Sequence, residues 1–124
     1  MRVEVQIDET RVAYGLAGIA YRRAERALER ATDAVEFDRK EIYAADGWDG
    51  QKRLDLANRY VGSVNALAGA QSRQRAALLA LSELGLSTWD IEPDDMDYAQ
   101  RAVKVRRALT AFSDVEDLFM DGDL

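Results

Sequence analysis

The chain has 124 residues, of which 48% are hydrophobic and 32% are charged, and this is the composition of a single folded domain. It contains neither cysteine nor histidine, which excludes disulfides, thiolate nucleophiles, imidazole bases and most transition-metal sites. The net charge of −6 disfavours binding to nucleic acid or to an anionic membrane. We expect no cofactor and no metal site, and nothing here indicates a small-molecule substrate.

Residues 1–7, MRVEVQI, alternate apolar and polar side chains with the period of a half-buried strand. No second strand is evident, so Val3, Val5 and Ile7 have three possible fates. The segment folds back as an irregular arm, extends the following helix, or adds to a sheet edge of another subunit. The last of these satisfies its backbone hydrogen bonds. We therefore treat these three residues as candidate interaction residues.

A long helix is predicted over residues 9–46. Asp8 has the character of its N-cap, and Ile7 with Val12 fits a hydrophobic staple. Gly15 and Gly18 are expected to be tolerated within the helix. Three rows of residues with sevenfold spacing predict a core-facing stripe that a partner helix approaches closely. The rows are Tyr14, Tyr21, Leu28, Val35, Ile42; Ala17, Ala24, Ala31; and Ala20, Ala27, Ala34.

The segment 47–50 predicts a tight turn into a second helix over residues 51–85. Gly47 suits the end of the first helix, Asp49 suits the N-cap of the second, and Trp48 is expected to cover the end of the hairpin core. Gly85 with Leu86 predicts a Schellman ending. The predicted seam, with two amides that would set the register, is Ala57, Tyr60, Val64, Leu67, Gln71, Gln74, Leu78, Leu81.

A connection is predicted over residues 86–93 and a third helix over 94–120, followed by a frayed tail, 121–124. Pro93 suits a first helical turn, and the aspartates after it suit the positive end of a helix dipole. Trp89 in the connection joins Trp48 as a candidate interaction residue. The predicted seam of this helix is Tyr98, Ala102, Val105, Leu109, Phe112, Val115, Phe119.

The triplet Trp48-Asp49-Gly50 between two long helices resembles the turn of the WXG100 family, which are small secreted helical hairpins. The resemblance implies a hairpin exported by a type VII-like route. The family's C-terminal Tyr-x-x-x-Asp/Glu pattern is missing, because Tyr98 is followed four residues later by Ala102, and Phe112 stands where a tyrosine would precede Glu116.

Asp38 and Glu41 continue the alanine rows and are therefore acids on a core-facing stripe. Two carboxylates so placed are either a pair for acid–base chemistry or buried charges that Arg53 or Arg59 of the second helix neutralises. We expect the second, because no imidazole accompanies them. Exposed basic residues on the second helix (Arg73, Arg75) and on the third (Arg101, Lys104, Arg107) are expected to be solvated faces.

These patterns predict an all-α fold in one domain, an elongated three-helix bundle. It consists of a long antiparallel helical hairpin, a third, shorter helix packed along it, and a short extended N-terminal arm. We expect a non-enzymatic structural or adaptor protein that assembles with copies of itself or with a protein partner, as in a phage- or virion-type particle. The alternatives are a WXG100-like secreted hairpin and an acidic inhibitor or regulator that binds a protein. We expect a cytoplasmic location or one inside an assembled particle, with type VII-like export as the alternative.

Overall fold

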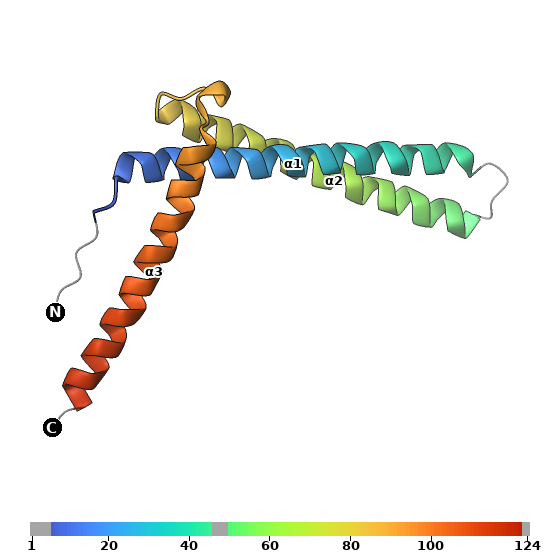
Figure 1. The fold of residues 1–124 in the computed structure, drawn as a ribbon. Coiled ribbons are helices and arrows are strands. Elements are labelled where there is room, and N and C mark those ends of the chain that lie inside the picture. Colours follow the sequence, from blue (N-terminus) through green and yellow to red (C-terminus); the bar gives the residue numbers. More distant parts are fainter. Residues whose placement is uncertain (1–5, 46–49, 123–124) are drawn as a thin grey trace.

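A computed structural model describes the backbone of residues 6–45 and 50–122, and the side chains within these ranges as far as Val115. It contains α1 (Glu9–Ala44), α2 (Gly50–Glu83), the short 3₁₀ helix η1 (Thr88–Asp90) and α3 (Pro93–Gly122). α1 and α2 form a long antiparallel hairpin, and α3 packs against α1, crossing it and projecting away (Figure 1). No strand occurs in the described residues, and the predicted all-α fold is confirmed.

The element boundaries lie close to the predicted ones. The connection contains the unpredicted η1, and α3 continues through Gly122, so the prediction that residues 121 and 122 belong to a frayed tail is wrong. Residues 1–5 and the turn 46–49 lie outside the described residues, and so do the predictions made for Val3, Val5, Gly47, Trp48 and Asp49.

Local signals fix where α1 begins. The carboxylate of Asp8 accepts hydrogen bonds from the backbone N–H groups of Thr10, at 3.1 Å, and Arg11, at 3.2 Å, two donors that have no partner inside the helix. Asp8 itself has an extended backbone. Val12, the expected staple residue, is buried, and Ile7 is half-buried. The predicted N-cap is confirmed.

Local signals also fix where α2 ends. Gly85 has a φ of +74°, a left-handed conformation that costs glycine little. The N–H of Leu86 bonds the carbonyl of Leu81 and the N–H of Gly85 bonds that of Ser82, both at 2.9 Å. This is the predicted Schellman motif.

The hairpin core contains small residues and few large ones. Tyr21 and Ala24 of α1 pack with Ala77 and Leu81 of α2, and Ala17, Leu86 and Ile91 cover this cluster. Of the two alanine rows predicted to face the core, the row with Ala24 is the more buried: Ala24 is buried, and Ala17 and Ala31 are half-buried. In the other row Ala20 and Ala34 are exposed, so the core-facing stripe is narrower than the sequence predicted.

The seam of α2 is rotated relative to the predicted one. Tyr60, Leu67, Gln74 and Leu81 lie at least half-buried on it, as expected. At the other four positions of the seam, the residue that faces α1 comes one residue before the predicted one. The prediction that two amides together set the register is therefore wrong, because Gln71 is exposed and only Gln74 lies in the seam. Small side chains let the two helices approach closely, and at all of these positions except the first the rotation brings a smaller side chain to face α1. The buried or half-buried alternates are Leu56, Ser63, Ala70, Ala77, in place of Ala57, Val64, Gln71, Leu78.

The crossing of α1 and α3 depends on two glycines that the sequence analysis treated only as tolerated. A Cβ atom on Gly15 would lie 2.6 Å from the Cβ of Ala99, and one on Gly18 would lie 2.9 Å from Ile91 Cγ2. Both distances are shorter than any ordinary contact between carbon atoms. Ala99 is completely buried here. The absence of side chains on α1 therefore lets the backbone of α3 lie directly on it.

Polar contacts surround this crossing and fix the direction of α3. Arg11 Nε donates to Asp95 Oδ1 at 3.0 Å, and its guanidinium lies 4.2 Å from the ring centroid of Tyr98. The backbone N–H of Asp8 donates to the Tyr98 hydroxyl at 2.8 Å, and Glu9 pairs with Arg106. The start of α1 is thus bound to the first half of α3.

Candidate protein-binding surfaces

The acids that the sequence placed on the core-facing stripe do not form a catalytic pair. Asp38 is 5% exposed. One carboxylate oxygen accepts from Arg59 Nε at 2.9 Å and the other accepts from the Ser63 hydroxyl. The Arg59 guanidinium also lies over the ring of Phe37. A carboxylate with both oxygens satisfied and a cation beside it is a structural group. Of the two arginines predicted to neutralise the acids, Arg53 or Arg59, the structure places Arg59 beside Asp38.

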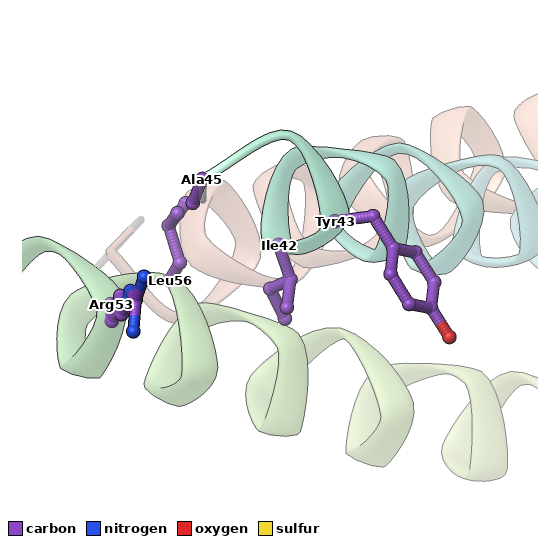
Figure 2. A pocket seen from close by; sticks show the side chains of 5 residues that line it. All are labelled: Ile42, Tyr43, Ala45, Arg53 and Leu56. Carbon is purple, nitrogen blue, oxygen red and sulfur yellow. The ribbon is translucent and has the colours of Figure 1, made fainter. Parts of the chain in front are cut away.

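Glu41 takes no part in this cluster. It is half-buried, and within the described residues no ion pair joins it to Arg53. Arg53 instead lines a hollow of about 340 Å³ near the tip of the hairpin. In this hollow Ile42, Ala45 and Leu56 contribute apolar surface from both helices (Figure 2). Tyr43 stands at its side with an exposed ring. The described lining contains no pair of groups for proton transfer or nucleophilic attack.

Of the predicted interaction residues, Ile7 and Trp89 lie in the described part of the chain, and they belong to different segments. Ile7 is half-buried just before α1, and Trp89 on η1 is 82% exposed. In Figure 1 the chain before α1 and the α2–α3 connection lie on opposite sides of α1. Trp48 lies outside the described residues, so the resemblance of its turn to the WXG100 family stays a prediction. Of the two tryptophans that the sequence makes candidate interaction residues, Trp89 is therefore the one that the described structure places on the surface.

A larger apolar surface follows the side of α2 that faces away from α1. Leu54, Val61 and Leu79 are 54%, 55% and 61% exposed. They are spaced by seven and eighteen residues, which are about two and five helical turns, so they lie on one side of the helix. We call this side the outer face of α2. α3 does not cover it, because α3 packs against α1.

A second surface lies between α1 and α3. Two cavities, of about 360 and 400 Å³, share Ile19, Arg23 and Gln100 and so form one groove along the crossing. Its apolar lining comes from Leu16, Ile19, Met96 and Val103. Its charged side chains are Arg22, Arg23, Arg26, Lys104, Arg107 and one acid, Asp97. The predicted solvated face of Lys104 and Arg107 is thus one wall of a basic groove.

Sequence reasoning missed both surfaces, and only one had a signal. Leu54 and Val61 are seven residues apart in the sequence, which is a signal for one side of a helix. The prediction nevertheless assigned the apolar side of this helix to the seam that contains Ala57 and Val64. For the groove no local signal existed, because its walls are eighty residues apart in the chain and meet only where α3 crosses α1.

No protein-family model matches the chain, and comparisons with curated proteins and with solved structures found no similar protein. Among the described residues, no helix is apolar over a length sufficient to cross a membrane, and no cluster of three or more metal-ligating side chains occurs. The outer face of α2 and the groove between α1 and α3 are therefore the structural basis for a proposed function.

Proposed function

We propose that this protein is a non-enzymatic structural or adaptor component that assembles with copies of itself through exposed helix faces. The observation that carries the proposal is the outer face of α2. Leu54, Val61 and Leu79 leave apolar surface in water along a helix whose other side already packs in the hairpin. Apolar side chains repeated along one face of a helix are a recurring form of contact site between proteins.

The chemistry of the described residues agrees with this role. The buried acid Asp38 is neutralised inside the hairpin, and the hollow near the hairpin tip has an apolar lining with one guanidinium. A long helical hairpin also offers extended faces at little cost in loop entropy, which suits a component that contacts several neighbours. A phage- or virion-type particle is one setting for such a component, and it stays a prediction.

The proposal is tested by light scattering over a wide range of protein concentration. We expect a mass above that of one chain, rising with concentration. Val61→Lys should lower this mass while the helical circular dichroism is unchanged, because the side chain is exposed and points away from α1. Ala66→Lys adds the same charge at an exposed position off the outer face and is the control. A wild-type chain that stays monomeric at every concentration contradicts the proposal.

A further inference from the structure

The groove between α1 and α3 combines apolar side chains with unneutralised cations. Leu16 is largely exposed at its edge, and Ile19 and Val103 are half-buried within it. Within the described part of the chain, no ion pair involves Arg23, Arg26, Lys104 or Arg107; only Arg22 has a partner there, Glu25 at 3.8 Å. Such a groove suits a ligand with an apolar side and negative charges beside it.

The last part of α3 has the complementary character. From residue 111 to the end of the chain there is no basic residue, and the acids are Asp114, Glu116, Asp117, Asp121, Asp123. Phe112 and Val115 of the same helix are at least half exposed. We call residues 111–124 the acidic end. Its backbone is helical as far as Gly122, and the described side chains of Phe112, Asp114 and Val115 are exposed on this helix.

A chain cannot place its own acidic end in its own groove. Lys104 and Arg107, which line the groove, belong to the same continuous helix as the acidic end. At 1.5 Å per residue, Asp114 lies about 10 Å further along the axis than Arg107. Beyond the crossing α3 leads away from the hairpin (Figure 1). The occupant must therefore come from another molecule.

We propose that the α1–α3 groove of one copy binds the acidic end of α3 of a second copy. The apolar side of that helix, with Phe112 and Val115, covers the apolar lining, and its carboxylates face the cations of the groove. Each chain then offers one groove and one acidic end, so copies join head to tail, or two copies exchange their ends reciprocally. This inference rests on the proposed self-assembly and adds a second contact between copies to the one proposed for the outer face of α2.

Charge reversal tests the contact from both sides. The groove variant carries Arg23→Glu and Lys104→Glu, and the end variant carries Asp114→Lys and Asp117→Lys. Each variant alone places like charges opposite one another, and we expect its self-association constant to fall by roughly tenfold or more. An equimolar mixture restores opposite charges at both contacts and should recover the mass of the wild type. Arg39→Glu with Lys40→Glu, two exposed cations outside the groove, is the matched control.

Cross-linking provides a measurement that does not depend on charge. The chain lacks cysteine, so single cysteines can be introduced by Gln100→Cys in the groove and by Val115→Cys in the acidic end. A disulfide between them shows that these two positions meet. A mixture of these two variants should form a disulfide-linked dimer faster than either variant alone. Higher salt should slow this reaction, because salt screens the charges at the groove.

The possible results separate this inference from the proposed function. A wild type that assembles, with both reversed variants at full wild-type mass, overturns the inference and leaves self-assembly intact. A wild type that is monomeric throughout overturns both. If the wild type stays monomeric but binds a single-stranded oligonucleotide, and the groove variant does not, then the groove is a nucleic-acid site and the inference is also wrong.

Discussion

Gly15 of α1 and Ala99 of α3 lie so close that a side chain on the glycine would occupy space that Ala99 already fills. A Cβ atom there would be 2.6 Å from the Ala99 Cβ. This contact sets the distance between the two helices and, with Gly18, the place where α3 crosses. The groove that we assign to self-assembly exists because of this crossing.

The first prediction concerns that contact. Gly15→Ala should push α3 away from α1 and lower the free energy of unfolding by about 1–3 kcal/mol, the usual cost of overpacking. Gly62→Ala is the control, because nothing lies within 4 Å of that position. It should stabilise the protein by about 0.5–1 kcal/mol, since alanine favours helix. Urea denaturation measures both, and a stabilising Gly15→Ala would remove the close contact from the structure.

The second prediction distinguishes the two alanine rows of α1. Ala24→Leu should overpack the cluster around Tyr21 and Leu81 and cost about 1–3 kcal/mol. Ala20→Leu makes the same chemical change at an exposed position and should change the unfolding free energy by less than about 0.5 kcal/mol. Equal melting temperatures for the two variants would show that the seam is not where the structure has it.

The third prediction concerns the buried carboxylate. A double-mutant cycle of Asp38→Ala and Arg59→Ala should give a coupling energy of about 1–2 kcal/mol, because the carboxylate is buried while the arginine is half exposed. The exposed pair Arg101–Asp97, with N and O 2.9 Å apart, should give about 0.5 kcal/mol or less. If both cycles give the same small value, Asp38 is solvated and its role in the hairpin core is lost.

The fourth prediction concerns pH. Burial raises the pKa of Tyr21 above the usual tyrosine value, and the Glu25 carboxylate raises it further. The fold thus favours the neutral phenol. Its contribution to stability is complete below about pH 10, where an unfolded tyrosine begins to ionise, and is lost as the pH rises through the higher pKa of the folded state.

Measurement of this effect requires a difference between variants. The free energy of unfolding of the wild type should fall more steeply above about pH 10 than that of Tyr21→Phe. Tyr43→Phe removes a largely exposed phenol and should leave the slope of the wild type unchanged. Parallel curves for the wild type and Tyr21→Phe would mean that the Tyr21 phenol is solvated.

Signals that act within one turn of the chain were readable from the sequence. Asp8 caps α1 and Gly85 ends α2 because an oxygen acceptor or a left-handed glycine satisfies backbone groups only a few residues away. Pro93 begins α3 for the same local reason. The number of α-helices, their approximate bounds and the neutralisation of Asp38 by an arginine of the second helix therefore followed from residue types and spacing, whereas the choice of Arg59 over Arg53 did not.

The tertiary structure alone decided the exact rotation of α2, the width of the buried stripe on α1 and the place where α3 lies. Neighbouring residues of a helix are about 100° apart. A rotation of α2 about its axis by only about half of this angle places Ser63 rather than Val64, and Ala77 rather than Leu78, in the seam. Which of the two seams faces α1 depends on how closely α1 and α2 approach each other. In the sequence, Gly15 and Gly18 are only weak helix formers. Their role in the close approach of α3 to α1 is evident only in the structure. The outer face of α2 and the basic groove arise from these contacts between distant segments, and no pattern within a single helix contains that information.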